Sequence, residues 1–189
     1  MNLCVIPARG GSRRIPGKNI KEFNGKPIIA YSIETALASG LFDKIVVSTD
    51  SDEIAEVALH YGAQVLKRQP ELAVDEVGTW EVVKNAAQTF EYVRYVCGIY
   101  TTSPLMLAGD LLRGHKLVSE YNFRHAVSVG YPPLQDAGQW YWSSEIAIEQ
   151  DIEYFDHRTA LVKIPAERVC DINTLSDWSR AEEMYAKLD

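Results

Sequence analysis

Cysteine and histidine are scarce in this chain of 189 residues, which holds three cysteines and four histidines. Cys4, Cys97 and Cys170 are odd in number, far apart and set in apolar segments. We therefore expect buried, reduced thiols and no disulfide framework, which favours a cytoplasmic protein. The histidines do not show the spacing of metal ligands, which argues against a zinc site.

Long hydrophobic runs and an excess of positive charge are also missing. No apolar stretch approaches the ~20 residues needed to span a bilayer, and residues 1–8 lack the basic leader of a signal peptide. The formal net charge of −7 argues against a general binder of nucleic acid or of membrane surfaces. The length is sufficient for one substantial core and short for two, which predicts a single domain over residues 1–189.

Short, β-branched runs that are apolar on both faces alternate with helical patterns along the chain. Strands are expected at Leu3–Pro7, Lys44–Thr49, Val93–Tyr100 and Ala126–Val129. Strands of this kind are covered by helices on both sides. The alternation predicts a doubly wound α/β domain with a mostly parallel sheet, whose ligands bind beyond the carboxyl ends of the strands.

Helix boundaries are indicated by capping residues. Apolar residues recur at helical spacing within 54–61, 80–90 and 178–188. Asp50 with Glu53, and Thr174 with Asp177, have the spacing of a capping box, which predicts helix starts there. Gly40 and Gly62 stand where two helices should end.

Positive charge is concentrated in the loop that follows the first expected strand. The stretch "ARGGSRRIPGKNIK" holds five basic residues and no acidic one. Gly10 and Gly11 allow backbone N–H groups to approach a ligand, Ser12 adds a hydroxyl donor, and the basic side chains add charge. The loop has neither the P-loop spacing nor the GxGxxG fingerprint. It predicts a polyphosphate site, with a solvated basic loop as the plain alternative.

The segment "IPARGGSRRIPGKNIKEFNGKPIIAYSI" closely resembles the signature of the acylneuraminate cytidylyltransferases, also called CMP-sialic acid synthetases. Similarity continues through "LFDKIVVSTDSDEIAEVALHYGA", "KRQPELAVDEVGTWEVV", "IYTTSPL" and "VCDINTLSDWSRAEEMY". Tyr100 stands where the sialic acid enzymes usually have glutamine, and "DAGQWYW" resembles the "DAGQFYW" of pseudaminic acid cytidylyltransferases. The resemblance therefore favours the pseudaminic acid branch.

The resemblance implies a Rossmann-like fold of the nucleotide-diphospho-sugar transferase type and an enzymatic activity. Such nucleotidyltransferases use CTP, Mg²⁺ and an acidic nine-carbon sugar, whose anomeric hydroxyl attacks the α-phosphorus of CTP to give the CMP-sugar and pyrophosphate. Positioning and electrostatic stabilisation should supply most of the acceleration. Pseudaminic acid is the expected sugar, and N-acetylneuraminic or legionaminic acid is the alternative within the class.

By the same resemblance, three basic residues are expected to act in catalysis, namely Lys18, Arg9 and Arg13. Lys18 matches the family's catalytic lysine and is expected to neutralise charge on the α-phosphate. The nucleotide-binding set is expected to comprise Ala8, Arg9, Gly10, Gly11, Ser12, Arg13, Lys18, Asn19, Arg68 and Asp75. Asn19 could instead be a turn residue, and Arg68 with Asp75 a surface ion pair.

The metal and sugar sites also follow from the resemblance. The family carries an Asp-x-Asp pair that holds Mg²⁺, and this chain has Asp171 and Asn173 at these positions. Alternate residues of an extended segment point the same way, and the amide oxygen of asparagine can ligate Mg²⁺, so we expect a weakened site. The sugar is expected to contact Thr102, Ser103, Gln139 and Tyr141. Gln139 and Tyr141 belong to an aromatic segment whose plain interpretation is core packing.

A second departure from the family lies near residues 130–136. The chain has only "GYPPLQ" there, whereas family members carry a longer excursion that helps to form a homodimer and the sugar pocket. A true deletion would weaken the dimer and the sugar selectivity. The rivals to a cytidylyltransferase are a catalytically weakened nucleotide-binding protein and a nucleotidyltransferase with another base preference.

Overall fold

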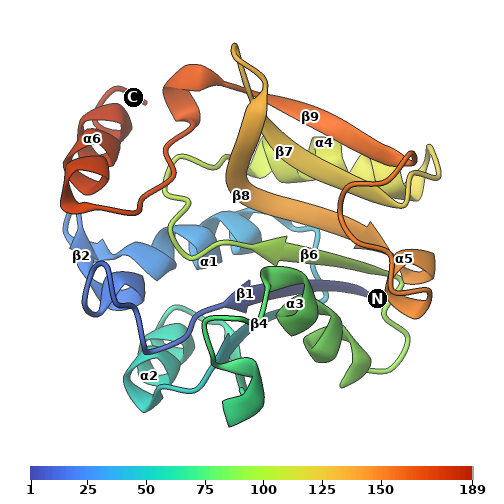
Figure 1. Cartoon of the computed structure of the whole chain (residues 1–189), viewed down its shortest axis with the longest axis horizontal. Helices are drawn as coiled ribbons and strands as arrows, with labels where there is room; N and C mark the ends of the chain where they lie inside the picture. Colours follow the sequence, from blue (N-terminus) through green and yellow to red (C-terminus); the bar gives the residue numbers. More distant parts are fainter. Residues whose placement is uncertain (189) are drawn as a thin grey trace.

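The computed structural model describes residues 1–188, in which a seven-stranded sheet separates two layers of helices (Figure 1). The strand order is β5-β4-β1-β6-β8-β7-β9. The strands are β1 (Asn2–Pro7), β4 (Lys44–Thr49), β5 (Gln64–Lys67), β6 (Tyr95–Ile99), β7 (His125–Tyr131), β8 (Gln135–Ser144) and β9 (Thr159–Pro165). β8 runs antiparallel to β6 and β7, and the other neighbours are parallel. The predicted mostly parallel α/β sheet is confirmed.

The helices and the remaining short strands fill the connections. The α-helices are α1 (Ile28–Ser39), α2 (Asp52–His60), α3 (Thr79–Gln88), α4 (Ala108–Ser119), α5 (Glu145–Glu149) and α6 (Leu175–Tyr185). The 3-10 turns are η1 (Lys18–Ile20), η2 (Pro70–Leu72) and η3 (Ala166–Arg168), and β2 (Glu22–Phe23) pairs with β3 (Lys26–Pro27) in a small hairpin. Within residues 1–188, no helix is both long and apolar enough to cross a membrane.

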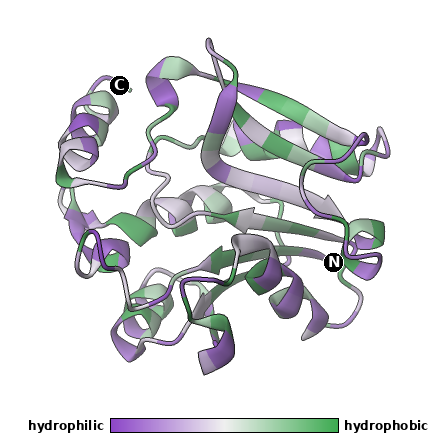
Figure 2. Cartoon of the chain, viewed as in Figure 1, coloured by the Kyte–Doolittle hydropathy of each residue, from purple (hydrophilic) through white to green (hydrophobic). Residues whose placement is uncertain are grey.

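The two faces of the sheet bury different sets of residues because side chains alternate along each strand. Cys4 and Ile6 of β1 face the helices α1, α2 and α4, whereas Leu3 and Val5 face α3 and α5. Figure 2 shows the consequence, since the central strands are hydrophobic while α2 and α3 are hydrophilic on their outer sides. All three cysteines are buried free thiols, as predicted.

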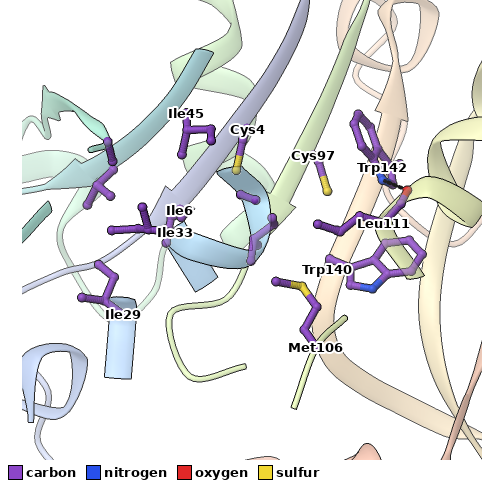
Figure 3. Packing of buried hydrophobic residues seen from close by; sticks show 14 of the residues in the cluster. Cys4, Ile6, Ile29, Ile33, Ile45, Cys97, Met106, Leu111, Trp140 and Trp142 are labelled. Atoms are coloured by element: carbon purple, nitrogen blue, oxygen red, sulfur yellow. Dashed lines mark hydrogen bonds between the residues drawn. The ribbon is translucent and has the colours of Figure 1, made fainter. Parts of the chain in front are cut away.

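Helix α4 lies unusually close to β8. A Cβ atom added at Gly114 would come within 2.7 Å of Cδ1 of Trp142 and 2.6 Å of Cη2 of Trp140, so this position has no room for a side chain. The indole N–H of Trp142 donates a hydrogen bond of 3.0 Å to the carbonyl oxygen of Leu111 (Figure 3). The aromatic segment "WYW" is therefore buried core, which was its plain interpretation.

A third apolar cluster joins the two ends of the chain. Trp178 of α6 packs with Phe23 of the β2–β3 hairpin, with Ile28 and Tyr31 of α1, and with Ile172. This packing brings the segment before α6 against the loop that follows β1. The basic loop and the segment that carries Asp171 and Asn173 thereby become neighbours.

The helix boundaries correct one expectation and confirm the others. The side chain of Ser51, not Asp50, caps α2 by accepting a hydrogen bond from the amide of Ile54, so the predicted cap at Asp50 is wrong. α2 ends at His60, and Gly62 terminates it as predicted: its φ is 91°, its amide donates to the carbonyl oxygen of Leu59, and the next amide donates to that of Ala58. The capping box of Thr174 and Asp177 at the start of α6 is confirmed, and Gly40 terminates α1.

Candidate active site

A cavity of about 510 Å³ opens at the carboxyl ends of β1, β5 and β6. The loop after β1, the segment 68–77 and the turn after β6 form its walls. Its lining comprises Pro7, Arg9, Ser12, Arg13, Arg14, Lys18, Asn19, Arg68, Val74, Asp75, Val77, Thr79, Val82, Tyr100, Thr101 and Thr102. A position beyond the carboxyl ends of the strands is where open α/β sheets bind ligands, as the sequence predicted.

The first part of the basic loop is anchored to β4. The amide of Ala8 donates to the carbonyl oxygen of Ser48 at 2.9 Å, which extends the pairing of β1. The amide of Gly10 donates to Oδ1 of Asp50 at 2.9 Å, and a Cβ atom at Gly10 would lie 3.1 Å from that of Ser51. Asp50 therefore holds the loop, and glycine permits the close approach. Ala8, Gly10 and Gly11 lie outside the lining of the cavity.

Asn19 ties the far end of the loop to the turn after β6. Its Nδ2 donates to the carbonyl oxygen of Arg9 at 2.9 Å, and its Oδ1 accepts from Oγ1 of Thr101 at 2.6 Å. The side chain is buried, and both of its polar ends have partners within the protein. Asn19 thus holds the loop in shape through its side chain. The alternative of a simple turn residue does not describe this role.

Two arginines of the loop share one carboxylate across the cavity. Asp75 forms ion pairs with Arg9 and, at 3.1 Å, with Arg13. Arg9 and Asp75 are each about one-third exposed, whereas Arg13 is largely exposed. An anionic ligand that binds Arg9 and Arg13 must therefore compete with Asp75.

Arg68 lies deeper in the cavity, and its side chain is hydrogen-bonded to β4. Its guanidinium donates to the carbonyl oxygen of Ser48 at 2.7 Å and to Oγ of Ser48 at 3.3 Å. Burial lowers the pKa of Arg68, while the charge of Asp50 opposes this shift and that of Arg9 adds to it. Arginine remains charged at neutral pH despite such a shift, so Arg68 contributes a buried positive charge to the cavity.

Lys18 reaches the other end of the chain. Its Nζ donates to the carbonyl oxygen of Ile172 at 2.6 Å. Burial lowers the pKa of Lys18, and the nearby charge of Asp171 opposes that shift. Lys18, for which the resemblance implies a catalytic role, thus lies in the cavity and beside the predicted metal ligands.

Asp171 and Asn173 contact one another through their side chains. Nδ2 of Asn173 donates to Oδ2 of Asp171, and the amide of Asn173 donates to Oδ2 of Asp177 at 3.1 Å. The pair points to the same side of the segment, as expected for alternate residues. In residues 1–188, no group of three or more histidine, cysteine, aspartate or glutamate side chains is arranged to hold a metal ion. The donor set of one carboxylate and one amide oxygen still matches Mg²⁺, which takes one or two protein ligands together with substrate phosphates.

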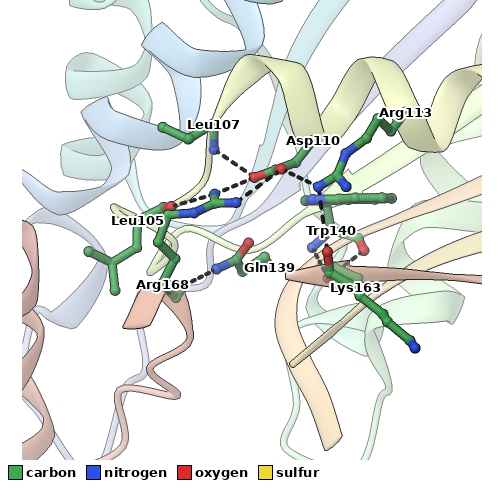
Figure 4. Close-up of polar contacts among 9 residues, drawn as sticks. Leu105, Leu107, Asp110, Arg113, Gln139, Trp140, Lys163 and Arg168 are labelled. Atoms are coloured by element: carbon green, nitrogen blue, oxygen red, sulfur yellow. Dashed lines mark hydrogen bonds and ion pairs between the residues drawn. The ribbon is translucent and has the colours of Figure 1, made fainter. Parts of the chain in front are cut away.

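Of the four residues predicted to contact a sugar, one lines the cavity and three do not. Thr102 lines the cavity. Ser103 is buried and points to the carbonyl oxygens of Gly138 and Gln139. Gln139 donates from Nε2 to the carbonyl oxygen of Arg168 at 2.5 Å (Figure 4), and the hydroxyl of Tyr141 donates to Asp136. Ser103, Gln139 and Tyr141 lie outside the lining, and their contact with a sugar stays a prediction.

Some lining residues were not in the predicted set. Arg14 belongs to the same basic run, and this run was the signal that could have included it. Tyr100 receives a hydrogen bond of 3.0 Å from Oγ1 of Thr79, and its ring packs edge-on against Tyr141. The apolar lining residues Val74, Val77 and Val82 gave no signal, because nothing in the sequence separates them from core residues.

The cavity is electropositive in an acidic protein. Five cationic side chains line it, namely Arg9, Arg13, Arg14, Lys18 and Arg68, and within the described residues Asp75 is the one carboxylate among them. The formal net charge of the chain is −7, so this concentration of positive charge is local. An anionic ligand of several charges is the complement of such a site.

Comparisons with known proteins identify the family. Residues 3–138 match the profile of a family described as cytidylyltransferase. Pseudaminic acid cytidylyltransferase of Campylobacter jejuni (serotype O:23/36, strain 81-176) is 36% identical over 223 aligned positions, which cover 97% of this chain and 96% of that protein. N-acylneuraminate cytidylyltransferase A of Danio rerio is 38% identical over 126 positions, which cover 67% of this chain and 29% of that protein.

A solved structure extends the likeness to the fold. CMP:2-keto-3-deoxy-manno-octonic acid synthetase, solved in complex with CTP, superimposes with a TM-score of 0.79 at 15% identity and covers 98% of both chains. At this identity the likeness concerns the fold alone. The profile match and the high coverage of the Campylobacter jejuni enzyme lead to one conclusion: the chain belongs to the cytidylyltransferase family.

Proposed function

We propose that this protein transfers CMP from CTP to the anomeric hydroxyl of an acidic nine-carbon sugar and releases pyrophosphate. The observation that carries the proposal is the 36% identity to a pseudaminic acid cytidylyltransferase across nearly the whole of both chains. Pseudaminic acid is accordingly the sugar that we propose. The electropositive cavity supports the choice of a triphosphate as the second substrate.

The triphosphate would bind along the basic loop. Arg9, Arg13 and Arg14 face the cavity and supply charge to the β- and γ-phosphates, while the hydroxyl of Ser12 can donate a hydrogen bond. Lys18 lies farther along the loop, beside Ile172, and we assign it to the α-phosphate. Charge that builds on the phosphoryl oxygens and on the departing pyrophosphate is then neutralised by groups already in place, which is the main source of acceleration in phosphoryl transfer.

We assign Mg²⁺ to Asp171 and Asn173. When bound, the ion supplies positive charge to the phosphate oxygens and so assists the departure of pyrophosphate. The protein would hold it with one carboxylate and one amide oxygen, which is one negative charge fewer than two carboxylates offer. We therefore expect a Mg²⁺ requirement with a reduced affinity.

The sugar side of the site is shortened in this chain. β7 and β8 are joined by a tight turn, since Gly130 pairs with Gln135. The alignment with the Campylobacter jejuni enzyme has 223 positions, more than the 189 residues of this chain, so that enzyme has residues with no counterpart here. We propose that part of this difference lies near 130–136, and that the single domain forms a weakened homodimer in the cytoplasm.

The proposal is tested by measuring pyrophosphate release from CTP and Mg²⁺ with pseudaminic, N-acetylneuraminic and legionaminic acid in turn. Release with pseudaminic acid at the highest kcat/KM is the expected result. A preference for N-acetylneuraminic acid would favour the second candidate, to which the likeness to the Danio rerio enzyme points. Measurable CTP binding with no release from any sugar would overturn the enzymatic proposal and favour a nucleotide-binding protein. Competition among CTP, UTP and ATP tests the base preference.

A further inference from the structure

Asp110 is a buried carboxylate that binds two arginines. It lies in the first turn of α4, is 4% exposed and accepts hydrogen bonds from two N–H groups of Arg168 and, at 2.7 Å, from Arg113 (Figure 4). Burial alone raises the pKa of Asp110, but the bonds from Arg168 and Arg113 outweigh it and hold the pKa below its ordinary value. Asp110 is thus ionised, and a buried ion needs its partners in place.

Arg168 is held at both its side chain and its backbone. The guanidinium binds Asp110, and the side chain is only 11% exposed. Its carbonyl oxygen accepts from Nε2 of Gln139 at 2.5 Å, so β8 fixes the backbone while α4 fixes the side chain. Arg113 differs because its side chain is 54% exposed. Figure 4 shows Arg168 and Arg113 approaching Asp110 from opposite sides.

Arg168 is the last residue of η3 and begins the segment that leads to the active site. Residues 169–173 have neither helix nor strand, so no backbone ladder positions them. Four residues beyond Arg168, the carbonyl oxygen of Ile172 accepts the hydrogen bond from Lys18, and Asp171 and Asn173 flank it. The far end of the segment is held by Asp177, which accepts from the amide of Asn173, and by the packing of Ile172 with the cluster around Trp178. The near end has Arg168 as its anchor. A shift at Arg168 would therefore move the groups beside Lys18.

We propose that Asp110 and Arg168 are positioning residues for the transfer reaction. Their ion pair fixes the start of segment 169–173 and thereby places Asp171 and the carbonyl group that orients Lys18. This inference rests on the proposed function, because it assigns the placement to the α-phosphate of CTP. Neither residue lines the cavity, so each acts through the segment.

The test needs variants that do not leave an unpaired buried charge. Arg168→Lys keeps the positive charge but loses the planar fork that gives Asp110 two hydrogen bonds. The double variant Asp110→Asn with Arg168→Gln removes both charges together. Arg113→Gln is the matched control, because it removes the other arginine from the same carboxylate and leaves the segment untouched.

Two quantities are measured for each variant, namely kcat and KM for CTP, and the hydrogen exchange of amides 169–173. A misplacement of about 1 Å can cost roughly 10²-fold in rate. We expect Arg168→Lys to lower kcat by about 10²-fold with KM for CTP within about threefold, and to speed the exchange of 169–173. Arg113→Gln should keep both quantities within about twofold of the wild type.

The outcomes separate this inference from the proposed function. If Arg168→Lys and the double variant turn over like Arg113→Gln, the inference is overturned. If the wild type releases no pyrophosphate with any sugar, the proposed function fails. The hydrogen exchange of amides 169–173 in the variants then tests by itself whether Arg168 positions the segment. Equal exchange in Arg168→Lys and Arg113→Gln would then overturn the positioning role as well.

Discussion

The ammonium group of Lys18 donates a hydrogen bond of 2.6 Å to the carbonyl oxygen of Ile172, although 154 positions separate the two residues. This contact joins the basic loop to the segment that carries Asp171 and Asn173. It exists because Ile172 packs with the cluster around Trp178 of α6. The groups assigned to phosphate and to metal therefore meet at one place.

Replacement of Lys18 tests its assignment to the α-phosphate. Lys18→Ala should lower kcat by roughly 10²–10³-fold, the usual cost of removing one group that stabilises charge in the transition state. Because burial lowers the pKa of Lys18, the activity of the wild type should also decline at a lower alkaline pH than the ordinary lysine value of 10.5 predicts. The exposed neighbour Lys21, changed to alanine, is the control. Unchanged CTP affinity and turnover in Lys18→Ala would contradict the assignment.

The ion pairs of Asp75 predict an effect on affinity. Asp75 neutralises Arg9 and Arg13, so it competes with a triphosphate for the same two cations. Asp75→Asn should tighten the binding of CTP and of pyrophosphate by about three- to tenfold, an effect that salt should diminish. Glu76→Gln makes the same change of charge at an exposed neighbouring position. Calorimetric titration with CTP distinguishes this competition from a direct contact between Asp75 and the nucleotide. If Asp75 contacts the nucleotide directly, Asp75→Asn will bind CTP more weakly than the wild type.

The asparagine of the metal pair predicts a gain of function. Asn173→Asp would add a carboxylate beside Asp171, and a higher ligand charge strengthens the binding of a hard divalent cation. The Mg²⁺ concentration for half-maximal turnover should fall roughly tenfold. Without metal the same variant should be less stable, since repulsion replaces the hydrogen bond from Nδ2 to Asp171. Asn24→Asp, in an exposed turn, controls for the added charge, and an unchanged Mg²⁺ dependence would contradict the assignment.

The sequence predicted the elements that satisfy simple patterns. β1 and β4 are apolar on both faces, so their strands were identified with bounds that agree to within one residue. β5, β8 and β9 were not predicted. β9 lies at the sheet edge, where its buried and exposed residues alternate, so it lacks the burial on both faces that marked the predicted strands. Asp50 was misassigned as a helix cap because Ser51, the next residue, can cap equally well. The local pattern does not reveal that Asp50 is used by the amide of Gly10.

The parts of the site that the sequence could not predict depend on distant packing. Basic residues near the N-terminus indicated an anion site, and the resemblance supplied Asp171 and Asn173. Their proximity to Lys18 follows from the packing of α6, which no short-range pattern encodes. The burial of Gln139 and Tyr141 likewise follows from the central place of β8 in the sheet. Residue types were therefore predictable where geometry was not.

Gly114 predicts a loss of stability from a substitution that usually stabilises helices. Alanine is favoured over glycine in a helix by about 1 kcal/mol, but a Cβ atom here would come within 2.7 Å of Trp142. Overpacking of this kind costs typically 1–3 kcal/mol or more, so the clash outweighs the helix propensity. Gly114→Ala should lower the free energy of unfolding by about 2 kcal/mol in urea denaturation.

Gly109 supplies the control within the same helix. It is exposed, and a Cβ atom there would meet no described atom within 4 Å. Gly109→Ala should leave stability unchanged or raise it by up to about 1 kcal/mol. Equal effects of the two substitutions would show that the close packing of α4 on β8 does not limit the residue at 114.

His125 predicts a loss of stability in mild acid. Its ring is fully buried between Trp80 and Tyr154, and its Nε2 has no hydrogen-bond partner among the described residues. Burial lowers the pKa of His125 from 6.5 to about 4, against the opposing charge of Asp156. Between about pH 6.5 and about pH 4, His125 therefore binds a proton in the unfolded chain but not in the folded protein. The free energy of unfolding falls as the pH drops through this range.

The effect of His125 can be separated from that of other groups by comparing slopes. Through this one residue, the free energy of unfolding of the wild type should fall by about 1.4 kcal/mol per pH unit, or by about 3 kcal/mol in all. His125→Asn is expected to be less stable at pH 7 but to lose less between pH 6.5 and 5 in urea denaturation. His157→Gln, at an exposed position, should follow the wild type. If His125→Asn and the wild type lose stability equally, His125 takes up its proton in the folded state, and the buried ring must then find an acceptor for Nε2.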